Sequence, residues 1–297
     1  MVQEFNPDNV LLSQKPDGEL LPNMNNLILQ DVRDTSIVTQ LGRYEEMNTQ
    51  EKTFTFQTDG VSAYWVDEGE KIQTTKPAIA QATMRAHKLG VIVVASREFL
   101  TYTWSDFFTE IRPQLSQAFR RKLDEATLLN VDNPFANSVE QAIESEGNIV
   151  EGGITYDNIL ALQDVLLENN VQPNAFVSKV QNATALRGAR DEFSGESLFD
   201  RSTESIDGLA MVNFDSDEME KGQLYAGDWD NLLYGIPYPI NYEISTQGQL
   251  STITNADGSP VNLFEQELIA MRATMDVATH ILRDDAFARL DPSEIVE

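Results

Sequence analysis

The chain has 297 residues, 41% of them hydrophobic and 23% charged, a composition typical of a globular protein with a core of its own. Its net charge of −27, from 21 basic and 48 acidic residues, opposes the attraction that brings proteins to nucleic acid, so we exclude a DNA-binding role. The absence of cysteine and the presence of only two histidines exclude disulfides, thiolate nucleophiles and histidine-rich metal sites.

The N-terminal residues 1–30 are expected to form a polar arm. They are rich in Asn, Asp, Gln and Pro with scattered Leu, a mixture too polar to build a core alone. They lack the basic start and apolar centre of a secretion signal, and no run in the chain approaches the roughly 18 apolar residues of a membrane helix. We therefore expect the protein to remain in the cytoplasm in which it is made and not to span a membrane.

Residues 53–86 predict a long hairpin whose tip projects from the body. Polar and apolar residues alternate at its start, and a polar stretch that contains Gly69 and Pro77 separates two strand-like segments. The run 91–95 that follows is continuously apolar and mostly β-branched. Such a run predicts a strand buried on both faces.

An amphipathic helix is predicted between residues 103 and 129, because apolar residues recur there at three- and four-residue steps. Thr103 and Asp106 have the spacing of a capping box, which indicates the start. Pro113 falls beyond the first turn, where proline deletes a backbone hydrogen bond. The helix should therefore bend at Pro113 or begin later, and we predict the bend.

Shorter helices and strands alternate in the second half, which predicts a compact subdomain of mixed type followed by a closing strand. The predicted elements are helices over 157–169, capped near Thr155, and 179–190; strands over 175–178, 209–214 and 223–226; a polar loop over 191–205; a hairpin turn at Asp257-Gly258; and a long strand over 271–281.

Acidic residues beside aromatic ones raise the question of a glycosidase, which needs two carboxylates flanking one bond. Asp67, Glu68 and Glu70 lie next to Tyr64 and Trp65. Neighbouring residues of a hairpin point to opposite faces, however, and a loop tip offers no walled pocket. We therefore predict that these acids are not catalytic.

Two acidic pairs, Asp215 with Asp217 and Asp228 with Asp230, are candidate calcium ligands by residue type. Neither run continues with the glycine and the distal glutamate of a calcium loop, so solvated turns are the expected structure. We predict no catalytic residue, no cofactor and no metal site in this chain.

Four segments, taken in order, resemble the major capsid proteins of tailed bacteriophages that have the Hong Kong 97 fold. They are a polar arm, a hairpin tip reading AYWVDEGEKIQTTKP, a strand reading KLGVIVVASREFL and a long helix reading SDFFTEIRPQLSQAFRRKLDEATLLN. Further on, DGLAMVN is similar to the family's strand entry, with Ala210 replacing a proline, and NLFEQELIAMRATMDVATHILRDDAFARL is similar to its closing segment. The resemblance extends over nearly the whole chain from about residue 27. It is specific because all of these segments occur in the same order as in the family.

The resemblance implies an α+β fold with an arm, an extended β-hairpin loop, a long spine helix, and peripheral and axial domains. The implied ranges are 1–30 for the arm, 31–130 for the first part of the peripheral domain with the extended loop at 53–86 and the spine helix at 106–129, 131–242 for the axial domain, and 243–297 for the second peripheral part. Contacts with other subunits are implied for Tyr64, Trp65, Glu68, Lys71 and Lys76 in the extended loop. A place near a symmetry axis is implied for Asp191, Glu192, Glu196 and Arg201.

These features favour a structural function over an enzymatic one. The resemblance implies a major capsid protein that self-assembles as pentamers and hexamers into an icosahedral shell around double-stranded phage DNA, without sequence-specific binding and without a membrane. Scaffolding and portal proteins are the implied partners, and the virion is the implied location. Two alternatives stay open: an encapsulin, which is a cellular compartment shell of the same fold, and a soluble acidic enzyme of low oligomeric state.

Overall fold

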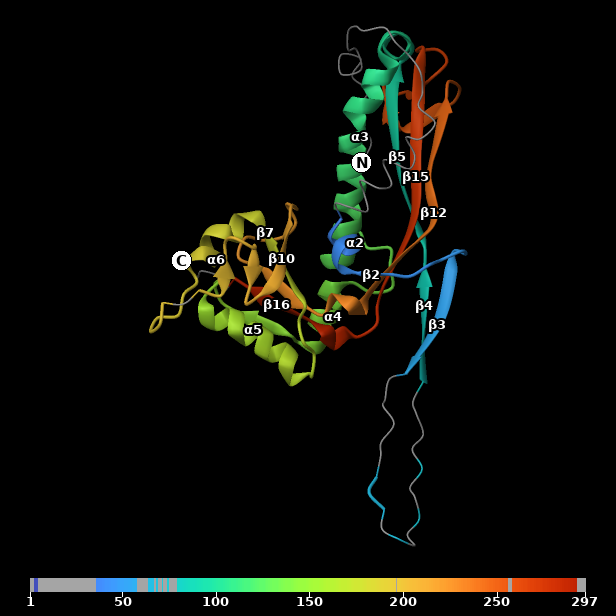
Figure 1. Ribbon diagram of the computed structural model, residues 1–297. Helices are drawn as coiled ribbons and strands as arrows, with labels where there is room; N and C mark the ends of the chain where they lie inside the picture. Colours follow the sequence, from blue (N-terminus) through green and yellow to red (C-terminus); the bar gives the residue numbers. More distant parts are fainter. Residues whose placement is uncertain are drawn as a thin grey trace.

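The computed structural model of the chain describes residues 3–4, 36–57, 64–66, 68, 71, 74, 79–195, 197–255 and 258–292. A long helix, α3 (Arg97–Leu128), connects an elongated sheet to a second body of mixed sheet and helices, and a hairpin leads away from both (Figure 1). Within the described ranges, no helix is both long and apolar enough to cross a membrane.

The elongated body is a four-stranded sheet with α3 packed against one face (Figure 1). Leu115 of α3 is buried against Met271 of the sheet, with Val91 and Val93 beside them. The strands, in order across the sheet, are β2 (Arg43–Tyr44), β12 (Leu232–Ser245), β15 (Leu268–Ile281) and β5 (His87–Ser96).

The second body is a seven-stranded sheet flanked by helices, and its core is continuous with α3. Phe119, Leu123 and Leu128 of α3 belong to the same buried cluster as Phe176 and Trp229 of this body. The strands, in order across the sheet, are β6 (Ile149–Glu151), β16 (Phe287–Asp291), β11 (Leu224–Gly227), β7 (Ala175–Lys179), β10 (Leu209–Phe214), β9 (Ser205–Ile206) and β8 (Phe199–Asp200). The helices are α4 (Val139–Glu146), α5 (Tyr156–Glu168) and α6 (Ala183–Gly188), with 3₁₀ turns η2 (Val180–Asn182), η3 (Trp229–Asn231) and η4 (Asp284–Ala286).

Two smaller sheets complete the described fold. One is the hairpin of β3 (Glu51–Gln57) and β4 (Ile79–Arg85), whose register runs from the pair Glu51 and Arg85 to the pair Gln57 and Ile79. The other joins β1 (Gln3–Glu4), β13 (Gln249–Thr254) and β14 (Pro260–Asn262). Apart from β1 and the few residues described elsewhere, the predicted arm over 1–30 and most of the hairpin between β3 and β4 lie outside the described residues.

Several predicted elements are confirmed. Helix α5 begins after Thr155, whose side chain accepts a hydrogen bond from the backbone N–H of Asn158 at 3.3 Å, as a capping residue does. Strands β3, β7, β10 and β11 and the long closing strand β15 also lie where the patterns predicted them. In these elements the local pattern was sufficient for the prediction.

The strand predicted over 91–95 exists, but the prediction that both of its faces are buried is wrong. Ile92 is 47% exposed, because α3 covers only the face of β5 that carries Val91 and Val93. A continuous run of apolar residues is therefore not sufficient to predict that both faces of a strand are buried.

The predicted start of the long helix is also wrong. The helix begins at Arg97, so residues 97–100 are helical although the resemblance placed them in the preceding strand. The cause lies in the partner strand: Ser96 pairs with Leu268, the first residue of β15, and beyond it there is no strand left to pair with. Arg97 makes its backbone hydrogen bond to the carbonyl of Glu267 instead, at 2.9 Å.

The helix predicted over 179–190 is shorter in the structure. Residues 178 and 179 still belong to the sheet, where Ser178 pairs with Leu224 and Lys179 with Phe214, and the helix α6 covers only Ala183–Gly188.

Strand β12 and helix α4 were not predicted at all. Pro237 and Pro239 speak against a strand, and the pairing of β12 with β15 does shift register around them.

Pro113 lies inside α3, so the alternative of a later helix start is wrong, whereas the bend at this residue stays a prediction. Proline removes one backbone hydrogen bond and clashes with the preceding turn, and Pro113 is exposed. We expect Pro113→Ala to raise the free energy of unfolding by about 1 to 3 kcal/mol, measured by denaturant unfolding of unassembled subunits. An unchanged or lower stability would contradict a strained helix at this position.

Asp124 holds the short helix α2 (Ile37–Leu41) against α3. Its carboxylate accepts hydrogen bonds from the Ser36 hydroxyl at 2.7 Å and from the backbone N–H groups of Ile37 and Val38 at 3.2 Å each. Ser36 makes no capping bond of its own, so a residue from a distant part of the chain caps this helix. Burial raises the pKa of Asp124 to about 6, although these hydrogen bonds and the charge of Arg120 act in the opposite direction.

We expect Asp124→Ala to lower the free energy of unfolding by about 2 to 4 kcal/mol, because it leaves a hydroxyl and two backbone N–H groups buried without an acceptor. Denaturant unfolding of unassembled subunits measures this loss. A loss below about 0.5 kcal/mol, the range of ordinary surface substitutions, would show that α2 does not depend on this carboxylate.

The raised pKa of Asp124 predicts that the stability of the subunit depends on pH in an unusual direction. Since the pKa of Asp124 is higher in the folded protein than its ordinary 3.8, the folded state binds the proton more tightly. The contribution of Asp124 to stability therefore rises as the pH falls from about 6 towards 4. The stability of the wild type relative to Asp124→Asn should improve over this window by on the order of 3 kcal/mol. A constant difference between the two proteins would refute the raised pKa.

Candidate inter-subunit surfaces

The hairpin β3–β4 is attached to the body by a small core of its own. Met47, Met84, Ala86, Leu233 and Ala278 form this cluster, separate from the main one. Phe54 of β3 packs against it, and its ring meets His280 edge-on at 6.0 Å between centroids. Burial lowers the pKa of His280. The hairpin therefore has a defined root, from which it leads away from α3 (Figure 1).

The residues predicted to make contacts in the hairpin are exposed wherever the structure describes them. Trp65 is 104% exposed, Tyr64 is 49% exposed, and Glu68 and Lys71 are exposed, whereas Lys76 lies outside the described residues. A fully exposed tryptophan leaves a large apolar surface in water, and such surfaces mark sites of interaction. Trp65 is the strongest candidate for an anchor in this hairpin.

The loop predicted to lie near an axis projects from the second body and has an ordered tip. Asp191 accepts hydrogen bonds from the backbone N–H and the hydroxyl of Ser194, at 2.9 and 2.5 Å, and these bonds lower the pKa of its carboxyl. Glu192 and Arg201 are exposed, and Glu196 lies outside the described residues. At the tip, Phe193 is 98% exposed.

Phe193 was missed by the sequence reasoning, which described its loop only as polar. The signal was a single aromatic residue between Asp191-Glu192 and Ser194-Gly195, inside a stretch with no helical or strand period. Isolated apolar residues in polar loops are common, and Leu198 and Phe199 of the same loop are partly buried, so the exposure of Phe193 became evident only from the structure.

Among the described residues, the face of the four-stranded sheet away from α3 is covered at its two ends. The hairpin root covers Ala278 at one end, and β13 and β14 cover Val94 and Ala270 at the other. Between them, Ile92 is 47% and Tyr238 is 51% exposed, and Arg272 forms an ion pair with Glu243. An uncovered strip of sheet is a second kind of surface on which another chain can lie.

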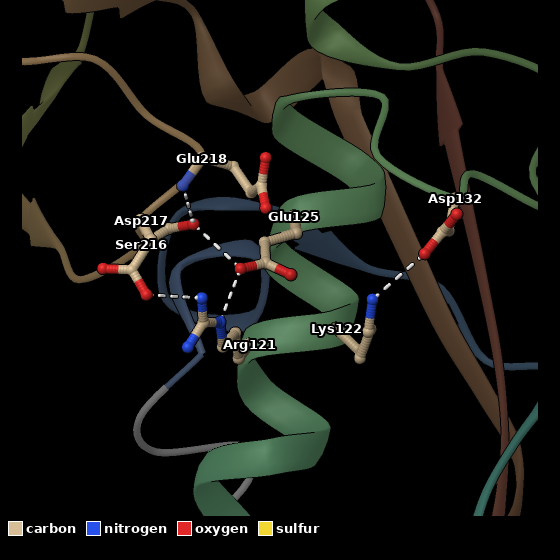
Figure 2. Close-up of polar contacts among 7 residues, drawn as sticks. All are labelled: Arg121, Lys122, Glu125, Asp132, Ser216, Asp217 and Glu218. Carbon is tan, nitrogen blue, oxygen red and sulfur yellow. Dashed lines mark hydrogen bonds and ion pairs between the residues drawn. The ribbon is translucent and has the colours of Figure 1, made fainter. Parts of the chain in front are cut away.

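A polar joint fixes the end of α3 to the second body (Figure 2). Glu125, with only 4% of its side chain exposed, accepts hydrogen bonds from Arg121 Nε at 2.7 Å and from the Ser216 hydroxyl at 2.8 Å. Arg121 also donates to Asp217 at 2.9 Å, and these partners raise its pKa. The Ser216 hydroxyl accepts from the backbone N–H of Glu218 at 3.2 Å. The joint fixes α3 to the loop after β10, because separation would take the Ser216 hydroxyl from the buried Glu125 and Asp217 from Arg121.

The acids considered as calcium ligands do not converge. Asp228 uses its carboxylate to accept hydrogen bonds from Asn174, Asn231 and the backbone of Asp230, which is the behaviour of a turn residue. Asp217 is bonded to Arg121. Within the part of the chain that the structure describes, no three His, Asp, Glu or Cys residues gather as a metal site would require.

A polar groove of about 710 Å³ lies at the end of α5, with Gln163, Asp207, Asp230 and Arg283 among its lining residues. No nucleophile paired with a general base is found in its lining, and the side chain of Arg283 is engaged with Asp285 at 2.6 Å. The groove gives no indication of a reaction. The described surfaces instead present exposed aromatic side chains on two projecting elements.

Comparisons with known proteins agree with a role in assembly. The model of the phage capsid family matches residues 19–291. The major capsid protein of Staphylococcus phage 80alpha is 48% identical over 293 residues, covering 98% of this chain and 90% of that protein. A probable major capsid protein of Mycobacterium phage L5 is 25% identical over 299 residues, covering 95% and 91%.

Solved structures share the fold. One from Microbacterium phage Oxtober96 superposes with a TM-score of 0.73 at 21% identity, covering 96% of this chain and 97% of that one. Another from Mycobacterium phage Adephagia has a TM-score of 0.74 at 18% identity, covering 88% and 91%. With a family model that spans nearly the whole chain and a relative close to half identical, the chain belongs to the phage capsid family.

Proposed function

We propose that this protein is the major capsid protein of a tailed bacteriophage, and that its copies assemble into the closed shell of the virion. The observation that carries this function is the 48% identity to a major capsid protein over 98% of the chain. The exposed Trp65 and Phe193, on elements that project from the body, supply the apolar anchors that an assembling subunit needs.

Within this function we assign the finer architecture of the Hong Kong 97 fold. The hairpin is the extended loop, α3 is the spine helix, the four-stranded sheet belongs to the peripheral domain, and the body within 131–242 is the axial domain. Strand β16 returns from the C-terminal part to pair with β11 and β6 of the axial sheet. In this assignment the loop that carries Asp191, Glu192, Glu196 and Arg201 lies nearest a five-fold or quasi-six-fold axis.

We also propose how the copies assemble and which partners they have. Pentamers and hexamers form an icosahedral shell in the host cytoplasm with the help of scaffolding and portal proteins, and the shell encloses double-stranded DNA without reading its sequence. The subunit has no enzymatic role. The encapsulin alternative is not favoured, because the relatives found by sequence are phage capsid proteins.

Assembly should respond to salt. Copies with a net charge of −27 repel one another, and the Debye length falls from about 10 Å at 0.1 M to about 3 Å at 1 M. We expect rings or shells in light scattering and electron microscopy, with a yield that increases with salt. A strictly monomeric protein at every salt and protein concentration would exclude a shell subunit.

Trp65→Ala should impair assembly while the subunit stays folded. Because Trp65 is fully exposed, its removal costs no packing within the subunit, whereas loss of an anchor at a contact costs about 2 to 4 kcal/mol. Shell yield by light scattering, with circular dichroism as the folding control, measures the effect. Trp65→Phe is the matched control and should keep most of the yield. A normal yield from Trp65→Ala would remove this residue from the contact.

A further inference from the structure

An apolar cavity of about 250 Å³ opens beside the C-terminal half of α3. Its wall includes the only aromatic pair of this region, since the rings of His87 and Phe135 meet edge-on at 5.8 Å between the centroids in the described structure. The other apolar lining residues come from three separate elements and the loop that follows α3: Leu89, Leu123, Ala126, Val131, Pro134 and Val277. The cavity therefore has a fixed shape, because packed elements and not a loop tip form its floor.

The rim of this cavity is basic. Lys88 and Lys122 both line it, against one acid, Asp132. The pair between Lys122 Nζ and Asp132 measures 3.2 Å, but the two side chains are 50% and 81% exposed, so the pair is weak and Lys122 can change partner. Lys88 is exposed and has no ion-pair partner among the described residues. In a chain with 48 acidic and 21 basic residues, this combination selects an apolar side chain flanked by acids.

The described surface offers such a side chain in the hairpin. Trp65 is fully exposed, and Glu68 follows it three residues later, also exposed. Trp65 is fully exposed in its own subunit and does not line this cavity there, so the occupant has to come from another copy. An apolar cavity of about 150 Å³ is enough to hold benzene, so 250 Å³ has room for an indole ring.

We propose that this cavity is the socket for Trp65 of a neighbouring copy, with Glu68 of that copy facing Lys122 and Lys88. The inference rests on the proposed function, because it requires copies packed side by side. Burial of an indole ring between Phe135 and the stem of a lysine, with the ammonium group near the ring face, combines apolar contact with a cation–π interaction. Phe193, which follows Asp191 and Glu192, and Phe264, which is 73% exposed and precedes Glu265, are competing occupants.

The absence of cysteine allows a direct test in assembled particles. Disulfides form only when the two Cα atoms lie within about 7 Å, so a cysteine pair reports contact without a background. The double variant Glu68→Cys with Lys122→Cys is assembled and oxidised. Three pairs serve as comparisons: Glu68→Cys with Lys221→Cys, an exposed lysine elsewhere; Glu68→Cys with Arg272→Cys, on the open sheet face; and Ser194→Cys with Lys122→Cys, on the loop that carries Phe193.

We expect a ladder of linked chains in non-reducing gels from the first pair alone. Shells that form but show no ladder from this pair would overturn the socket while leaving the proposed function intact. A ladder from the Arg272 pair would place the hairpin on the open sheet face. A ladder from the Ser194 pair would show that the loop of Phe193 occupies the cavity. Either result would also overturn the proposed socket. Failure of the wild type to form shells would instead count against the proposed function.

A charge exchange gives an independent readout. Lys122→Glu should lower shell yield about tenfold, and adding Glu68→Lys should restore it to within about twofold. Because Lys122 is half exposed, the melting temperature of the unassembled subunit should stay unchanged in both proteins. An equal loss of yield in Lys122→Glu with and without Glu68→Lys would show that the two residues do not face each other.

Discussion

The fold depends on two adjacent carboxylates near the end of α3, Asp124 and Glu125, both of which are almost completely buried. A buried carboxylate is costly unless hydrogen-bond donors surround it, and each of the two recruits donors from a different part of the chain. Asp124 takes them from residues 36–38, and Glu125 from Arg121 and Ser216. The chain before the hairpin and the seven-stranded body are therefore both positioned on the same turn of one helix.

This arrangement leaves the projecting elements free of the main core. The hairpin is attached through a separate small cluster around Met84, and the Phe193 loop is ordered by hydrogen bonds from Ser194 to Asp191 within its own tip. Their aromatic residues find no cover in the subunit, and the surrounding acids keep single copies apart. A subunit with exposed aromatic residues is suited to assembly, because contacts between copies remove this apolar surface from water.

Much of the fold could be predicted from local signals. The helix after Thr155, the long strand β15 and the hairpin strands β3 and β4 depend on neighbours in sequence, and the predictions there are confirmed. The errors arose where a distant partner decides the structure. The strand β5 ends at Ser96 because β15 begins at its partner Leu268, and β12 forms despite two prolines because β15 pairs with it on both sides of them.

The candidate surfaces were predictable to a smaller extent. The resemblance predicts contacts for Tyr64, Trp65, Glu68 and the loop after Asp191. The structure shows that Tyr64, Trp65 and Glu68 are exposed, and the contacts stay a prediction. Phe193 and the cavity at Lys122 were not predictable. The cavity is built from His87, Leu123, Phe135 and Val277, residues that are separated by up to 190 positions and carry no common motif.

A three-dimensional reconstruction of purified, assembled protein by electron cryomicroscopy tests the central claim most directly. The account predicts a closed icosahedral shell in which the hairpin of each subunit crosses to a neighbour and the indole density of Trp65 fills the cavity beside Lys122. A preparation that contains only monomers or small oligomers, or a shell in which each hairpin contacts its own subunit alone, would contradict it.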